Sequence, residues 1–288
     1  MNMGPQHPSA HGVFRAILTL EGETVVAVDA VIGYLHRCHE KLAETLAYAQ
    51  YPSIASKTDY VAAMTSELAY VMAAEQIGKI EVPKRAQHLR VLVDELQRIA
   101  SHCLWLGTWC MDMGGALGGG ATIFLYCIRE RELILDLFES LVGARLLYGF
   151  HQVGGVRYDI PDGWTDAVPR DDRPASSSAS TSTRQMLEDN PFFTMRTKGV
   201  GVISRELAQD VGIAGPLLRG SGVELRSPAR AAVFVVRGLR VHASRSRPAG
   251  DCYARYRVRM VGVPRVDQDR PAGRSTACPK GRSRRGPA

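Results

Sequence analysis

The pattern of apolar and polar positions divides the chain into a short β-rich start and a long helical body. Residues 13–29 alternate between apolar and other side chains around the turn Glu21–Glu23, which predicts a β-hairpin. Over Val31–Tyr148 the apolar residues recur at helical spacing instead. We therefore expect an N-terminal loop and hairpin over 1–30, a long-helix bundle over 31–150, and a mainly α fold with a small β portion (α+β).

Three long helices are expected in the body. The first opens at Tyr60, with a cap at Thr58 or Asp59. The second runs from Pro83, a residue tolerated in a first helical turn, to Gly114. The third covers about 122–141. The apolar stripe of the first is Val61, Met64, Leu68, Val71 and Met72.

Two further segments follow the bundle. Residues 151–223 read as a small α+β segment with a strand at Val200–Ile203, a cap at Ser204 and a disrupted loop at 171–185. From residue 224 the chain is rich in Arg, Pro, Ala and Ser without a sustained period. Such a composition buries too little apolar surface to offset chain entropy, so 224–288 is expected to be an aberrant, disordered basic tail.

The net charge of +7 is distributed unevenly along the chain. Residues 224–288 hold 16 basic and 4 acidic residues, a balance of +12, which leaves 20 basic and 25 acidic residues in the rest of the chain. The body is mildly acidic. A nucleic-acid binder is disfavoured, because the basic tail has neither interleaved aromatic residues nor a recognition motif.

The cysteines point to reduced thiols. None of the 6 stands in a C-x-x-C pair, which argues against a disulfide framework and against a metal or iron–sulfur site held by this chain alone. No run of eighteen apolar residues and no signal peptide are present in the sequence, so we expect a protein that faces a bacterial cytoplasm.

The most specific motif is the loop Met3–Gly12, in which His7 and His11 flank Pro8. Proline fixes φ and glycine permits positive φ, so the loop is shaped and its imidazoles can be aimed. With this loop the chain resembles the quinone-site subunit of respiratory complex I (NADH:quinone oxidoreductase), a family related in fold to the nickel–iron hydrogenase large subunit. The other matching strings are Ile32–Arg37, Asp59-Tyr60, Arg98–His102, Arg129–Glu132, Gly154–Arg157 and Gly215–Gly222.

The resemblance implies roles for particular residues. In that family the quinone headgroup lies between the loop histidine that His11 matches and the helix tyrosine that Tyr60 matches. A carboxylate that Asp112 matches orients the histidine, and Arg37 matches an arginine near the partner's cluster. His7 would support the pocket. Histidine and tyrosine suit the chemistry, since a quinone carbonyl needs donors that can also release a proton.

The resemblance also implies cofactors and partners. The chain would bind no cofactor itself. Quinone is the substrate, and the iron–sulfur cluster, FMN and NADH belong to partner subunits. Its partners would be the terminal iron–sulfur subunit and the membrane-arm subunit at the quinone channel. The complex would be a proton-translocating oxidoreductase, with this subunit peripheral on the cytoplasmic side of the bacterial inner membrane.

The chain departs from the family in two respects. Leu147 stands where a cluster-linked histidine is usual, and His151 lies four residues further on. Similarity fades at 171–185, 224–249 and 261–288, which we interpret as frame-shifted segments. Two alternatives stay open: a non-functional truncated relic of the subunit, and a hydrogenase-like large subunit, disfavoured because two C-x-x-C pairs are required for its metal.

Overall fold

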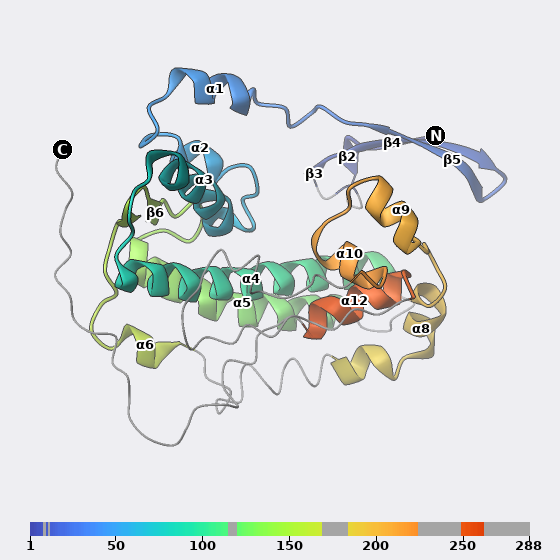
Figure 1. Cartoon of the computed structure of the whole chain (residues 1–288). Coiled ribbons are helices and arrows are strands. Elements are labelled where there is room, and N and C mark those ends of the chain that lie inside the picture. The colour runs from blue at the N-terminus through green and yellow to red at the C-terminus, as the bar shows by residue number, and fades with distance from the viewer. Residues whose placement is uncertain (8–9, 11, 115–119, 169–183, 224–248, 262–288) are drawn as a thin grey trace. The chain divides into compact units, whose positions relative to one another are not determined.

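The computed structural model describes residues 1–7, 10, 12–114, 120–168, 184–223 and 249–261 (Figure 1). The chain divides into two compact units, residues 1–51 and 52–288. This division lies beyond the predicted boundary at residue 30. Helix α1 (His39–Thr45) buries no residue and so adds nothing to the core of the helical body. The predicted fold class, mainly α with a small β portion, is confirmed.

The first unit is built on the predicted hairpin. Strands β4 (Arg15–Glu21) and β5 (Thr24–Val31) pair antiparallel across a turn in which Gly22 has φ 62°. Strand β1 (Asn2–Met3) pairs with the other edge of β4. Strand β2 (Gln6–His7) pairs antiparallel with strand β3 (Gly12–Val13). This pairing brings together the two ends of the loop that contains His7 and His11.

The second unit is predominantly helical. Its elements are α2 (Pro52–Ala55), α3 (Ala63–Gly78), α4 (Lys84–Met113), α5 (Gly120–Val142), β6 (His151–Gln152), β7 (Gly155–Val156), α6 (Trp164–Ala167), α8 (Pro191–Thr197), α9 (Arg205–Asp210), α10 (Gly215–Gly220) and α12 (Cys252–Val261). Residues 184–188 are also helical. Among the described helices, none has both the length and the apolar composition required to cross a membrane.

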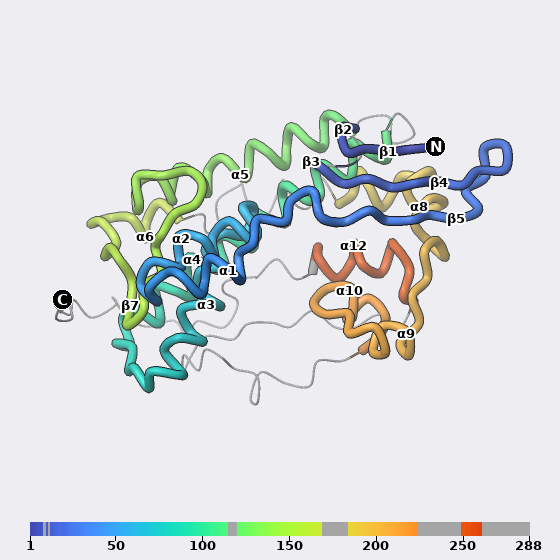
Figure 2. Tube along the Cα trace, turned by 90° about the horizontal axis from the view of Figure 1, so that it is seen from above, coloured from blue at the N-terminus to red at the C-terminus, as the bar shows by residue number. Residues whose placement is uncertain are grey.

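Helices α4 and α5 form the centre of this unit and lie side by side (Figures 1 and 2). The predicted ends of α4 are confirmed: Pro83 is its N-cap and Gly114, with φ 68°, its C-cap. The helices also approach closely where α5 begins, since a Cβ on Gly120 would lie 2.5 Å from the Cys110 carbonyl oxygen. The main core that they share comprises Ala63, Met64, Leu89, Val93, Leu96, Ala100, Ile134, Leu135, Leu137, Phe138, Leu141, Tyr148, Phe150 and Trp164.

Helix α3 begins later than the sequence pattern predicts. Its first residue is Ala63 and its N-cap is Ala62, so the expected start at Tyr60 and a helix cap at Thr58 or Asp59 are wrong. The Asp59 carboxylate accepts a hydrogen bond from the Val61 amide at 3.0 Å and thereby stabilises the turn before the helix. The predicted apolar stripe is present, with Met64, Leu68 and Val71 buried.

The C-terminal part corrects two expectations. Val200–Ile203 is not a strand. Its backbone makes single hydrogen bonds with residues 250 and 252 instead. Helix α12 buries Ala254, Tyr256 and Val258, so the expected disordered tail is wrong for Cys252–Val261. Tyr256 belongs to a second core with Leu106, Cys110, Ile123, Cys127, Leu187 and Phe193. Residues 224–248, 262–288 and most of 171–185 lie outside the described residues.

Candidate functional site

The structure places the predicted quinone-site residues in different units. His7 and Arg37 are exposed in the first unit. Tyr60 and Asp112 belong to the second. His11 lies outside the described residues. A shared cavity of His11 with Tyr60, and a hydrogen bond from His11 to Asp112, therefore stay predictions.

Tyr60 occupies the turn that leads into α3, and its side chain is 56% exposed. The backbone beside it is anchored, because the Gln97 amide Nε2 donates to the Val61 carbonyl at 2.8 Å. Gln97 is buried in the middle of α4. The sequence thus presents a phenol hydroxyl, a hydrogen-bond donor with a dissociable proton, on a turn fixed to the central helix.

Asp112 lies in the last turn of α4 and is exposed. It follows Gln97 by fifteen residues, and at about 1.5 Å of rise per residue the two backbone positions lie roughly 22 Å apart along the helix.

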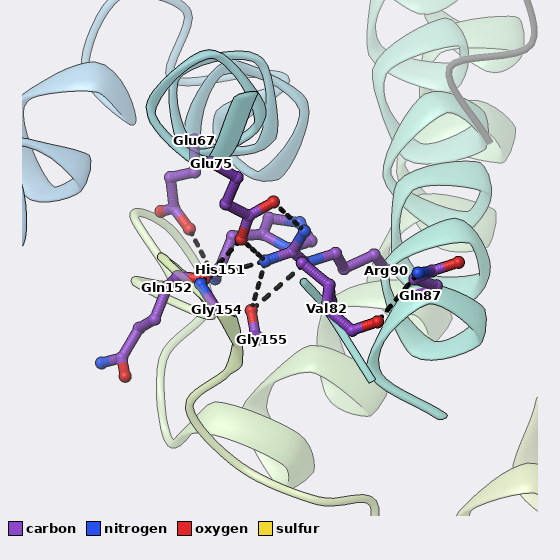
Figure 3. A network of polar contacts seen from close by, with 9 residues as sticks. All are labelled: Glu67, Glu75, Val82, Gln87, Arg90, His151, Gln152, Gly154 and Gly155. Atoms are coloured by element: carbon purple, nitrogen blue, oxygen red, sulfur yellow. Dashed lines mark hydrogen bonds and ion pairs between the residues drawn. The ribbon is translucent and has the colours of Figure 1, made fainter. Parts of the chain in front are cut away.

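A buried ion pair joins α3 to α4 and to the β6–β7 hairpin (Figure 3). Arg90 donates Nη1 to one Glu75 oxygen at 2.9 Å and Nη2 to the other at 2.6 Å, with side chains only 2% and 8% exposed. Arg90 also donates to the carbonyls of Gln152 and Gly155, and Glu75 accepts from the Gly154 amide at 2.7 Å. The pair is thus almost fully hydrogen-bonded, as a buried pair must be.

Glu67 makes a second connection from α3 to the same loop. Its carboxylate accepts from the backbone amides of Gly149, Phe150 and His151 at 2.8, 3.0 and 3.3 Å. Burial raises the pKa of the Glu67 carboxyl above its ordinary value, although the three amides and His151 act in the opposite direction. Glu67 and Glu75 therefore fix the path of residues 149–154 on the surface of α3.

Sequence reasoning missed this network, although a signal was present. Glu67 and Glu75 follow Met64 and Val71 at helical spacing, so both lie on the apolar face of α3. A charged residue on such a face requires a buried partner. The opposite charge, Arg90, likewise follows Ala86 by four residues and precedes Val93 by three, and both of these are buried in α4.

The described residues contain no group of three or more His, Cys, Asp or Glu side chains arranged to hold a metal ion. Burial raises the pKa of the Cys103, Cys110 and Cys127 thiols to about 12. These cysteines are therefore protonated at neutral pH, whereas metal ligation needs a thiolate. Cys38 is exposed.

The sequence was compared with known protein families and with individual proteins. Residues 118–264 match the model of the respiratory-chain NADH dehydrogenase 49 Kd subunit. The chain is 44% identical over 265 residues to an NADH-quinone oxidoreductase subunit of Koribacter versatilis (strain Ellin345), covering 91% of this chain and 63% of that protein.

Two chloroplast proteins have similar sequence identity to this chain. A chloroplastic NAD(P)H-quinone oxidoreductase subunit of Cucumis sativus is 43% identical over 263 residues, which is 91% of this chain and 65% of that protein. The protein of the same name from Daucus carota is 46% identical over 224 residues, 78% of this chain and 56% of its own length. The chain spans less than two thirds of the length of these relatives.

Proposed function

Because the chain belongs to the family of respiratory-chain NADH dehydrogenase 49 kDa subunits, we propose that it is the quinone-site subunit of an NADH:quinone oxidoreductase. The observation that carries the proposal is the 44% identity over 265 residues to one of the subunits of that enzyme. The exposed hydroxyl-bearing side chain of Tyr60, held on a turn that is anchored to α4, supports a role at the quinone.

The proposed chemistry is the reduction of quinone to quinol, which takes two electrons and two protons. Tyr60 donates a hydrogen bond to one headgroup carbonyl, and His11 donates to the other. Asp112 holds the ring of His11 in the donating tautomer and stabilises the imidazolium. His7 supports the loop, and Arg37 lies toward the partner that carries the terminal cluster.

The electrons come from partner subunits in this proposal. An iron–sulfur cluster, FMN and NADH are held by those partners, and the chain itself binds none of them. Its direct neighbours are the terminal iron–sulfur subunit and the membrane-arm subunit at the quinone channel. The assembled complex couples quinone reduction to proton translocation, with this subunit peripheral on the cytoplasmic side of the bacterial inner membrane.

The test is Tyr60→Phe in the assembled complex. Loss of a proton donor at the headgroup is expected to lower NADH:quinone reductase activity by on the order of 100-fold. NADH oxidation with an artificial ruthenium acceptor, which bypasses the quinone, should be unchanged. Tyr158→Phe removes an exposed hydroxyl elsewhere in the same unit and serves as the matched control.

Two results would contradict the proposal. One is wild-type quinone reduction by the Tyr60→Phe complex. The other is a chain that never enters the complex, which identifies the truncated relic instead. Equal loss of both activities would point to an assembly defect, and quantifying the incorporated subunit by mass spectrometry separates this case from a direct effect.

A further inference from the structure

Three titratable side chains from three segments meet in the interior of the second unit. Glu67 comes from α3, Asp94 from α4 and His151 from β6. Glu67 and His151, drawn in Figure 3, are both fully buried, and Asp94 is 13% exposed. The His151 Nε2 lies 3.6 Å from the Asp94 Oδ1, and the His151 amide donates to Glu67.

The imidazole of His151 lacks the hydrogen bonds that a core histidine normally has. A neutral imidazole offers one donor and one acceptor, and burying either without a partner is costly. Within the described part of the chain neither ring nitrogen of His151 has a hydrogen-bond partner, and Asp94 Oδ2 has none either. A proton on Nε2 would convert the 3.6 Å separation into an attractive ion pair with Asp94.

Charged groups from α3, α4 and α5 surround this pair. On α3 the facing groups are Glu67 and Glu75, and on α4 they are Arg90 and Asp94. Glu75 and Arg90 neutralise each other through their two hydrogen bonds. The remaining neighbours are the hydroxyl of Tyr148, whose pKa burial raises to about 12, and Arg131 of α5, which acts on Tyr148. Two carboxylates, Glu67 and Asp94, thus lie beside His151, and Arg98 of α4 acts on Asp94 from the same helix.

The cluster is connected to the turn that carries Tyr60. Gln97 follows Asp94 by three residues and therefore lies on the same face of α4. Its amide donates to the Val61 carbonyl, directly after Tyr60. The hydroxyl of Tyr148 makes no hydrogen bond within the described residues and lies within electrostatic range of Glu67. One glutamine side chain thus separates the carboxylate–imidazole cluster from the proposed quinone residue.

We propose that His151 is a buried proton acceptor that regulates the quinone chemistry at Tyr60. This inference rests on the proposed function. In the step, a hydronium ion of the solvent gives its proton to the neutral imidazole at Nε2, which releases water and leaves an imidazolium beside Asp94. No electron moves, and the net charge of the cluster of Glu67, Asp94 and His151 becomes more positive by one unit. The added positive charge stabilises the negative charge that develops on a quinone at the Tyr60 turn. His151 is a positioning residue and does not touch the quinone.

The test compares the pH profile of quinone reduction in complexes that carry His151→Gln, Asp94→Asn or wild-type chain. Wild-type activity should fall as the pH rises and His151 loses its proton, and this limb should be absent in His151→Gln. In Asp94→Asn the limb should move to lower pH by roughly one to three units, because a stabilising negative charge is lost. His88→Gln replaces an exposed histidine of α4, the helix that also carries Asp94, and should retain the wild-type pH profile.

A second measurement does not depend on activity. Exchange of the histidine C2 hydrogen for deuterium, followed by mass spectrometry on the intact complex, reports the protonation of each histidine. We expect His151 to titrate in the wild type and its midpoint to fall in Asp94→Asn. If His151→Gln does not assemble, Asp94→Asn decides the matter through both readouts.

Two outcomes overturn the inference: a His151 that does not titrate, or an Asp94→Asn complex whose pH profile and midpoint equal those of the wild type. Failure of the proposed function is a different result. It appears as unchanged quinone reduction in Tyr60→Phe, while the deuterium exchange at His151 still titrates and still responds to Asp94→Asn.

Discussion

Replacing Glu75 by glutamine tests the buried network that attaches the 149–156 segment to the helical body. The substitution keeps the size of the side chain but removes its charge. Arg90, only 2% exposed, would then carry an unbalanced positive charge in the interior. Its hydrogen bonds to the carbonyls of Gln152 and Gly155 would remain, so the protein should still fold at low temperature.

The expected cost follows from the geometry. Both Glu75 oxygens accept from Arg90, at 2.9 and 2.6 Å, and removing one partner of such a buried pair costs about 3–5 kcal/mol. For a unit of this size 1 kcal/mol corresponds to about 2–4 °C in Tm. We therefore expect Tm to fall by roughly 6–20 °C.

The assay is thermal unfolding of the purified chain, followed by circular dichroism in the far ultraviolet. Glu139→Gln is the control, since it removes one carboxylate of the exposed ion pairs around Arg145 and should leave Tm unchanged. In the double variant Glu75→Gln/Arg90→Met the fall in Tm should be much smaller than in Glu75→Gln alone, because neither side chain then buries a charge. A Glu75→Gln chain as stable as Glu139→Gln would refute the reasoning.

Three further predictions concern single groups. The folded-state pKa of Glu67 is raised by burial above its ordinary value of 4.5. The difference in unfolding free energy between wild type and Glu67→Gln, measured by urea titration, should therefore favour wild type most below pH 4.5 and shrink as the pH rises through the raised pKa. A difference that grows with pH would contradict this. Ser204→Ala should destabilise the start of α9 by about 1 kcal/mol, seen as faster amide exchange over 205–210, because its Oγ accepts from the Leu207 amide. Iodoacetamide at mildly alkaline pH should alkylate exposed Cys38 long before buried Cys110 and Cys127, whose thiol pKa burial raises. Early alkylation of Cys110 or Cys127 would contradict the burial of these two thiols.

Local sequence rules predicted the elements whose ends depend on local chemistry. The hairpin follows from alternation around Gly22, which adopts positive φ. Helix α4 begins after Pro83 and ends at Gly114, because proline suits the start of a helix and glycine suits a cap with positive φ. The cap of α9 at Ser204 is equally local.

The errors arose where distant contacts override local preference. Helix α3 starts after Val61 because Gln97, far away in sequence, takes the Val61 carbonyl. Val200–Ile203 satisfies its backbone with residues near Gly250 and not with a neighbouring strand. Helix α12 was assigned to a basic tail because of its arginines, yet Ala254 and Val258 lie four residues apart on one buried face.

The predicted site residues depend on motifs and not on periodicity. Nothing in the period of α3 or α4 distinguishes Tyr60 or Asp112 from other polar residues, and only the family motifs single them out. Glu67, Glu75 and Arg90 were missed for the opposite reason, since no motif contains them and their pairing is visible only once the helices pack. Their positions on apolar helix faces were the one local sign.

Photoaffinity labelling shows most directly whether this chain forms part of a quinone site. The assembled complex is illuminated with an azido-quinone, and the labelled residues are mapped by mass spectrometry. We expect label on the peptide that contains Tyr60, and we expect excess unmodified quinone to abolish it. Label confined to the partner subunits, or label at Tyr60 that excess quinone does not displace, would contradict a quinone site on this chain.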